Sequence, residues 1–213
     1  MVVFLKKKFF HIVLLFIIGG LFGYIFETLV YLVKNGEFTN KSGLWFTPLK
    51  PIYGLGLILI SLFYKLKDKD VISLFLLGFL LGSIYEYIAS IFQEYILHTS
   101  TWNYSNMESN LNGRITLSYS CIWGIFTFLW LKYGINFYLK FYNKVIKYKI
   151  TYKIITIISI ILLIDITFTS IVTKRYSERK RGIKSNTNID RIIDKYINNS
   201  SFEEKFPNLR VKT

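Results

Sequence analysis

The chain has 213 residues, of which 52% are hydrophobic and 18% aromatic, and its mean hydropathy is +0.37. A soluble domain of this length rarely contains so much apolar sequence. The net charge of +14 therefore points to membrane head groups as its partner. It does not point to nucleic acid, because a basic nucleic-acid-binding face needs a folded polar domain, for which the chain has little room.

Five apolar segments are long enough, or nearly so, to cross a membrane. The hydrocarbon layer is roughly 30 Å thick and takes about 20 helical residues, and helices are favoured because lipid cannot satisfy an exposed backbone. In chain order the segments are Phe9–Val33, Leu44–Tyr64, Val71–Leu97, Ile115–Leu131 and Ile154–Val172. The sequence therefore predicts an all-α, polytopic membrane helical bundle of about five spans.

The segments between the spans complete the predicted organisation. A basic N-terminus (1–8) precedes a membrane core (9–149) that ends in an amphipathic connector. A fifth span (150–173) and a basic polar tail (174–213) follow, and the tail is expected to anchor to head groups. The first span is longer than a signal-peptide core and lacks a cleavage site, so we expect it to be retained. Basic residues are divided almost evenly between the two sides, which leaves the orientation open.

The first four spans contain an internal repeat. The first span carries Gly19, Gly23 and Glu27, and the third span carries Gly78, Gly82 and Glu86 with the same four-residue spacing. This spacing keeps all three residues near one face of a helix, where the glycines allow another backbone to approach closely. We therefore predict two related units, 9–64 and 71–131, that run parallel about an axis along the membrane normal.

Several carboxylates fall inside the predicted spans, where an unpaired charge costs a few kcal/mol. Glu27 and Glu86 occupy matching positions in the two units, so we interpret them as a functional pair. Glu94 extends a polar stripe on the third span, and Asp165 lies in the fifth. For these last two, taken singly, a structural role is favoured.

The loops after the first and third spans carry the remaining candidates. The first loop leads through Pro48 and Pro51 to Tyr53, and the second contains Trp102, Tyr104, Asn112 and Arg114. The aromatic side chains also suit the head-group layer. Alternation of the spans places both loops on one side, so we expect them to meet over Glu27 and Glu86. Arg114 would then supply the counter-charge.

At these residues the sequence resembles the bacterial membrane proteins known as putative ABC-transporter permeases, the CmpB-like or type IV group. The resemblance runs in order from about Gly19 to Gly124 and includes these motifs: G-x-x-x-E at 23–27, P-x-x-P-I-Y-G at 48–54, the glutamates Glu86 and Glu94, W-x-Y-S at 102–105, N-L-N-G-R-I at 110–115 and Y-S-x-x-W-G at 119–124. Two positions depart from the family pattern. Lys41-Ser42-Gly43 replaces N-R-G, and Trp102-Asn103-Tyr104 replaces W-D-Y, which removes a carboxylate.

The resemblance implies a transporter-like subunit in a bacterial cell membrane. The chain contains no G-x-x-x-x-G-K-[ST] phosphate loop, so any ATP-driven transport requires a separate nucleotide-binding subunit. Our first hypothesis is that a small polar or lipid-like ligand lies between the two units. The expected ligand-binding or polar cluster is Glu27, Tyr53, Glu86, Glu94, Trp102, Tyr104, Asn112 and Arg114.

Two other functions remain open from the sequence. Paired carboxylates can act as general acid and base when burial separates their pKa values, so an intramembrane enzyme acting on a lipid or head group is one alternative. A non-catalytic assembly or regulatory protein is the other. A non-enzymatic role is favoured, because no metal cluster or nucleophile arrangement is recognisable and no cofactor is predicted. Membrane lipids are the expected partners, with self-association left open.

Overall fold

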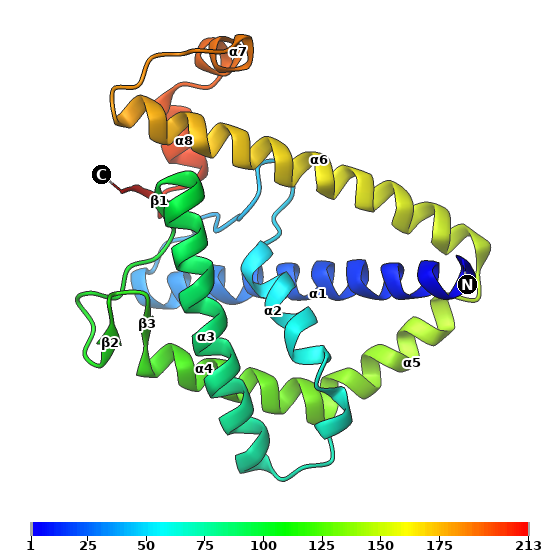
Figure 1. Cartoon of the computed structure of the whole chain (residues 1–213). Coiled ribbons are helices and arrows are strands. Elements are labelled where there is room, and N and C mark those ends of the chain that lie inside the picture. Colours follow the sequence, from blue (N-terminus) through cyan, green and yellow to red (C-terminus); the bar gives the residue numbers. More distant parts are fainter. Residues whose placement is uncertain (1, 213) are drawn as a thin grey trace.

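The computed structural model describes the backbone of residues 2–212 and the side chains of residues 7–212. That part of the chain is mostly helical, with four strands of two residues each. The all-α prediction is therefore confirmed. The helices are α1 (Val2–Asn35), α2 (Pro51–Ser61), η1 (Tyr64–Leu66), α3 (Val71–Leu97), α4 (Leu117–Leu129), η2 (Trp130–Gly134), α5 (Ile135–Val145), α6 (Lys149–Lys180), α7 (Asn188–Tyr196) and α8 (Asn199–Lys205), and the strands are β1 (Thr99–Ser100), β2 (Asn110–Leu111), β3 (Ile115–Thr116) and β4 (Arg210–Val211) (Figure 1).

Three helices in the described part of the chain are long and apolar enough to cross a membrane. They are α1 from Lys7 onward, α3 and α6, with 29, 27 and 32 residues. Large apolar side chains are exposed along all three, among them Leu29, Ile88 and Leu163. An exposed apolar surface of this extent marks a contact with lipid or protein. These helices coincide with the first, third and fifth predicted spans and fit membrane insertion.

The second and fourth predicted spans form shorter helices than the sequence indicated. Pro51 starts α2, because proline suits the first helical turn and holds the preceding Lys50 in an extended conformation. Residues 44–50 are therefore not helical. The helix α4 passes into the π-helical turn η2 and then into α5. At 1.5 Å per residue, the 11 residues of α2 and the 13 of α4 rise only about 16 and 20 Å.

Each short helix packs against the long helix that precedes it in the chain. Glycines allow the close approach: a Cβ atom added at Gly23 of α1 would lie 2.2 Å from the Tyr53 ring of α2. One added at Gly82 of α3 would lie 2.3 Å from Cβ of Trp123 in α4. The four helices thus form two pairs, α1 with α2 and α3 with α4. Figure 1 shows α1 and α3 crossing each other rather than running side by side.

The connector α5 buries one face against the rest of the protein. Its buried residues are Ile135, Tyr138 and Tyr142, and two of them contact the N-terminal half of α1. The Tyr138 hydroxyl lies 2.8 Å from Nδ1 of His11, and the Tyr142 hydroxyl donates to the Lys7 carbonyl at 2.6 Å. From α5 the chain turns into α6, which packs along α1 through a core that includes Phe10, Val13, Phe16, Ile155 and Leu162.

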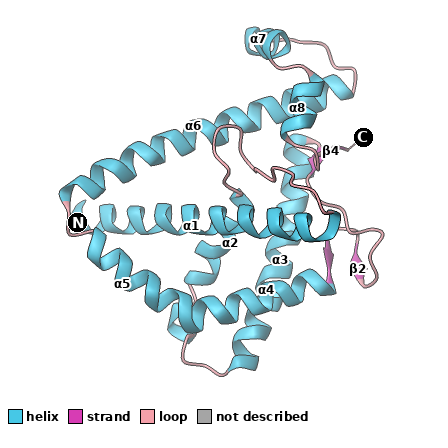
Figure 2. Cartoon of the chain, turned by 180° about the vertical axis from the view of Figure 1, so that it is seen from behind, coloured by secondary structure: helices cyan, strands magenta, loops and turns pink. Residues whose placement is uncertain are grey.

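The tail folds back onto the protein. Its helices α7 and α8 bury Ile193 and Phe202 against Val172 and Tyr176 of α6. Strand β4 pairs antiparallel with β1, next to the C-terminal end of α3. In Figure 2, α7, α8 and β4 lie at the same end of the molecule as β2 and the C-terminal end of α1. Three basic residues of the tail, Arg175, Arg179 and Lys180, form ion pairs with its own acidic residues.

Asp165 joins α6 to the first loop and is fully buried. Its carboxylate accepts hydrogen bonds from the backbone N–H groups of Phe46 and Thr47 at 2.9 and 2.8 Å. The Thr47 hydroxyl donates to the same carboxylate at 2.7 Å. These bonds satisfy backbone donors of a non-helical segment that has no ladder of its own. The geometry supports the structural role that the sequence favoured for Asp165.

Candidate functional site

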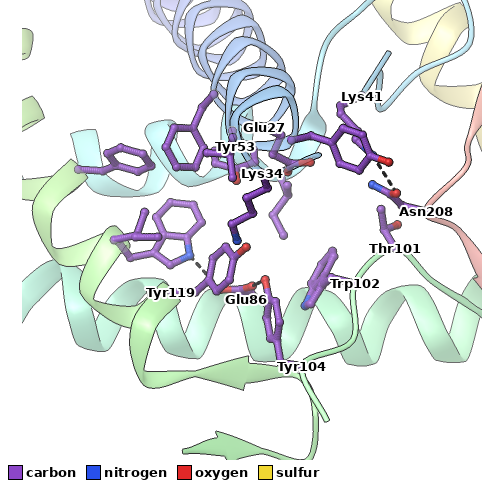
Figure 3. Close-up of a pocket in the computed structure, with 17 residues that line it drawn as sticks. Glu27, Lys34, Lys41, Tyr53, Glu86, Thr101, Trp102, Tyr104, Tyr119 and Asn208 are labelled. Carbon is purple, nitrogen blue, oxygen red and sulfur yellow. Dashed lines mark hydrogen bonds between the residues drawn. The ribbon is translucent and has the colours of Figure 1, made fainter. Parts of the chain in front are cut away.

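A cavity of about 250 Å³ lies where the two helix pairs meet the loops (Figure 3). All four paired helices line it, through Glu27 of α1, Tyr53 of α2, Glu86 of α3 and Trp123 of α4. The tail adds Asn208. The cavity is therefore built from segments far apart in the chain, and both Glu27 and the buried Glu86 line it.

Glu27 is neutralised by a lysine from the first loop. The Lys50 ammonium donates to Oε2 of Glu27, and the Lys50 side chain is only 7% exposed. Backbone geometry fixes this lysine, because its N–H donates to the Gly20 carbonyl at 3.1 Å. Its own carbonyl accepts from Tyr53 and Gly54 in the first turn of α2. The counter-charge of Glu27 is thus Lys50, whereas we expected Arg114.

Glu86 has a different environment, made of neutral donors. The Tyr104 hydroxyl donates to Oε1 at 2.8 Å, and the Trp123 indole N–H donates to Oε2 at 3.0 Å. Glu86 itself is 5% exposed. No lysine or arginine among the described side chains lies within ion-pair distance of it. The two glutamates therefore share one cavity but differ in how their charge is balanced.

A second lysine, Lys41, lies at the opposite side of the cavity and is also 5% exposed. Its ammonium donates to Oδ1 of Asn208 at 3.0 Å and lies 3.6 Å from the centre of the Tyr31 ring. Burial lowers the pKa of Lys41; the nearby Lys50 lowers it further, while Glu27 raises it. Figure 3 shows Lys41, Asn208 and Thr101 grouped on one side, with Glu86, Tyr104 and Tyr119 on the other.

Aromatic rings form much of the cavity wall. Tyr53 and Trp123 stack with centroids 5.8 Å apart, and Tyr104 and Tyr119 stack at 4.6 Å. Burial raises the pKa of the Tyr104 hydroxyl well above its ordinary value, and the adjacent Glu86 raises it further. Tyr104 therefore stays protonated and remains a hydrogen-bond donor. The wall offers flat π faces beside a buried carboxylate.

Five of the eight residues predicted for the site line this cavity: Glu27, Tyr53, Glu86, Trp102 and Tyr104. Glu94 and Arg114 instead form an ion pair with each other at 2.7 Å, and Arg114 also donates to the Ser90 hydroxyl at 2.9 Å. Asn112 donates to the Tyr87 hydroxyl at 2.9 Å. These three residues fix the second loop to the C-terminal half of α3, outside the cavity lining.

Sequence reasoning missed several residues of the site. Lys50 is not among the predicted site residues, although its position between two prolines indicates a fixed loop conformation. Trp123 enters the sequence analysis only within a family motif, although it follows Tyr119 by one helical turn. Lys41 is likewise not among the predicted site residues. Asn208 gave no local signal, because the folding of the tail brings it to the cavity.

The side chains of the site offer charges and hydrogen bonds. No group of three or more His, Cys, Asp or Glu side chains in the described residues is arranged to hold a metal ion. Carboxylates, ammonium groups, phenols and indoles instead offer hydrogen bonds and charge to an organic ligand. A few polar groups converging in a largely aromatic cavity are typical of a small-molecule site.

Comparison with known proteins agrees with the resemblance read from the sequence. Residues 14–170 match the family model described as "Putative ABC-transporter type IV". No curated protein and no solved structure gives a significant match. The matched segment includes α2, α3, α4 and most of α1, which together form most of the cavity, whereas Asn208 lies beyond it. The chain is a membrane protein and belongs to the putative ABC-transporter type IV family, the CmpB group.

Proposed function

We propose that the chain is a transporter-like membrane subunit that holds a small polar or lipid-like ligand between the two helix pairs. The observation that carries this proposal is the cavity, which is lined by both Glu27 and Glu86. At about 30 Å³ per water molecule, its 250 Å³ correspond to roughly eight waters. That space suits a small solute or the head group of a lipid.

An internal duplication supports a site at this interface, and we propose that the α1–α2 and α3–α4 pairs are its two copies. A Cβ added at Gly19 would lie 2.5 Å from the Tyr53 carbonyl oxygen. One added at Gly78, the matching glycine, would lie 2.7 Å from the Trp123 carbonyl oxygen. The corresponding glycine in each long helix therefore meets the corresponding residue in each short helix.

The reciprocal contacts follow the same rule. Gly54, after Tyr53, approaches Phe16, whereas Gly124, after Trp123, approaches Phe75. Phe16 precedes Gly19 by the same interval that separates Phe75 from Gly78. Matching contacts in both directions are expected for two copies of one unit. In duplicated transporters, ligand sites lie at the interface between the copies, where this cavity is found.

The family description adds an energy source to the proposal. Because the chain has no phosphate-loop motif, ATP hydrolysis would come from a separate nucleotide-binding subunit in the same bacterial cell membrane. We expect such a subunit to co-purify with the full chain extracted from its native membrane. Its identification by mass spectrometry of the purified complex would place the chain in an ATP-driven system.

Native mass spectrometry of the full chain, purified in a mild detergent, tests whether a ligand is held. Val30 lines the cavity, whereas Val33 on the same helix is 84% exposed and outside the lining. Val30→Trp fills the cavity and should remove a bound small molecule or lipid that the wild-type chain retains. Val33→Trp adds the same bulk outside the cavity and should leave the bound mass unchanged.

The same two variants also give the result that would contradict the proposal. If the wild-type chain carries no bound molecule, or if Val30→Trp retains it as fully as Val33→Trp does, the cavity does not hold a ligand. Size-exclusion profiles that match the wild type would show that both variants remain folded. The non-catalytic assembly role would then become the better description of the protein.

A further inference from the structure

Two buried side chains of opposite charge face the cavity without an ion-pair partner among the described residues. Glu86 and Lys41 are each 5% exposed, and both line the cavity. Both make their contacts with neutral groups: Glu86 with Tyr104 and Trp123, and Lys41 with Asn208 and the Tyr31 ring. A buried charge that lacks a compensating charge costs several kcal/mol. Each of these two groups therefore lacks a compensating charge among the described residues on the side that faces the cavity.

Under the proposed duplication, the lack of a cation at Glu86 distinguishes the second helix pair from the first. In the first pair, Lys50 lies three residues before Tyr53 and neutralises Glu27. The corresponding residue, three before Trp123, is Ser120. The Ser120 hydroxyl donates to the Thr116 carbonyl and pairs with the Ser83 hydroxyl. The second pair thus keeps the carboxylate but lacks its cation.

The surroundings of Glu86 suit a ligand cation. The rings of Tyr104, Tyr119 and Trp123 line the cavity next to this carboxylate (Figure 3). An ammonium group is attracted both to a carboxylate and to the faces of aromatic rings, and the attraction to rings grows when water is excluded. A primary or quaternary ammonium therefore fits this end.

The surroundings of Lys41 suit a ligand anion. Its ammonium, the Thr101 hydroxyl and the Asn208 carboxamide lie together on the other side of the cavity (Figure 3). Glu27 raises the pKa of Lys41, but it forms its ion pair with Lys50. Phosphate and carboxylate groups match such a set of donors.

We propose that the cavity binds a zwitterion, with its ammonium group at Glu86 and its phosphate or carboxylate group at Lys41. This proposal rests on the proposed ligand-holding function and names the class of ligand. The same chemistry occurs in a soluble zwitterion and in a zwitterionic lipid head group. Glu86 and Lys41 lie on different sides of the cavity, so they do not pair with each other (Figure 3).

Isothermal titration calorimetry of the full chain in detergent tests the charge pattern. Phosphoethanolamine carries both charges, ethanolamine only the cation and inorganic phosphate only the anion. We expect phosphoethanolamine to bind at least tenfold more tightly than either half. Lys41→Gln should reduce its affinity to that of ethanolamine, and Glu86→Gln should reduce it to that of phosphate. The matched controls Lys65→Gln and Glu37→Gln, both at exposed positions, should bind as the wild type does.

A second experiment, with lipids, shows whether the zwitterion is a soluble molecule or the head group of a lipid. Native mass spectrometry of the chain released from nanodiscs that contain equal parts of phosphatidylethanolamine and phosphatidylglycerol would show which lipid is retained. Retention of phosphatidylethanolamine, lost in Glu86→Gln, supports the proposal with a lipid as the source, whether or not the free zwitterion binds.

The proposal is overturned if phosphoethanolamine binds no more tightly than its halves and phosphatidylethanolamine is not preferred. These comparisons use the wild-type chain, so they stand even if a variant fails to fold. Retention of phosphatidylglycerol alone, lost in Val30→Trp, would overturn the zwitterion but leave the ligand-holding function intact. The absence of any ligand that Val30→Trp displaces would remove both.

Discussion

At the scale of single residues, the cavity depends on how each buried charge is balanced. Lys50 and Glu27 form an ion pair whose lysine is almost fully buried, while Glu86 relies on a phenol and an indole. Removing one partner of a buried pair leaves an uncompensated charge, which costs more than removing both. The Glu27–Lys50 pair should therefore behave as one unit in stability measurements.

The first prediction concerns that pair. Glu27→Gln or Lys50→Met alone should lower the free energy of unfolding by about 3 kcal/mol, whereas the double variant should lose clearly less than the sum. Denaturant unfolding in detergent micelles would give the coupling energy, which we expect to exceed about 1 kcal/mol. The exposed Lys67–Asp68 pair is the matched control, with a coupling near zero. Strictly additive losses at Glu27 and Lys50 would show that the two charges act independently.

At the scale of elements, close helix contacts through glycine hold each pair together. Gly23 and Gly82 lie against Tyr53 and Trp123, where no Cβ atom fits without movement. Gly20, one helical position beyond Gly19, has more room, because a Cβ there would lie 3.2 Å from the Leu49 side chain. The three glycines thus allow a graded test of the packing.

We expect Gly23→Ala and Gly82→Ala to destabilise the chain by about 1–3 kcal/mol each, the usual range for overpacking. Gly20→Ala should change stability little, because a better helix residue offsets a mild contact. Thermal unfolding followed by circular dichroism in detergent would compare the three. If Gly82→Ala were tolerated as well as Gly20→Ala, the close contact of α3 with α4 would not exist.

The docking of the tail depends on the charge of Asp194. Arg175, which is 4% exposed, donates to both oxygens of Asp194 at 2.9 and 2.8 Å, and Arg179 donates to the same carboxylate at 2.8 Å. These bonds hold the pKa of Asp194 down at about 2, mainly through Arg175. The ordinary value is 3.8. The carboxylate therefore stabilises the docked tail once the pH is above about 4.

This stabilisation should be lost as the pH falls from about 4 to about 2, because the unfolded tail takes up a proton that the docked tail resists. Since Asp194 is 29% exposed, solvent screening limits the effect to about 1–2 kcal/mol. Hydrogen exchange of residues 188–205, corrected for the intrinsic rate at each pH, would measure it. Asp194→Asn should reduce the pH dependence to the part that comes from Asp190 and Glu203, whose pKa values are also lowered. Asp68→Asn, at an exposed position, should leave it unchanged. Equal protection at pH 5 and pH 2 would contradict the docking contact.

At the scale of the whole molecule, the sequence predicted the helical membrane bundle and the family, because long apolar segments and ordered motifs carry that information locally. It also singled out Glu27 and Glu86, which line the cavity, because their matching registers mark one face of each helix. The short lengths of α2 and α4 were not predicted, since hydropathy does not register the restraint that Pro51 imposes or the π-helical turn at Trp130–Gly134.

The other contacts that the sequence did not predict join segments distant in the chain. Arg114 pairs with Glu94 on the adjacent helix, while Lys50 reaches Glu27, and neither choice follows from span alternation. Asn208 reaches Lys41 because the tail docks through Phe202 and β4. Figure 1 shows the result, with the loops and the tail gathered at one end of the molecule.

A crystal structure of the full chain, purified from its native membrane without exchange of lipids, tests the central claim most directly. The claim is that the cavity between the two helix pairs is a ligand site. We predict electron density for a small molecule or head group inside it, with atoms at hydrogen-bond distance, about 2.7–3.2 Å, from the Glu86 carboxylate or the Lys41 ammonium. A cavity that contains only water, or that closes so that Glu86 and Lys41 pair with protein side chains of opposite charge, would contradict the account.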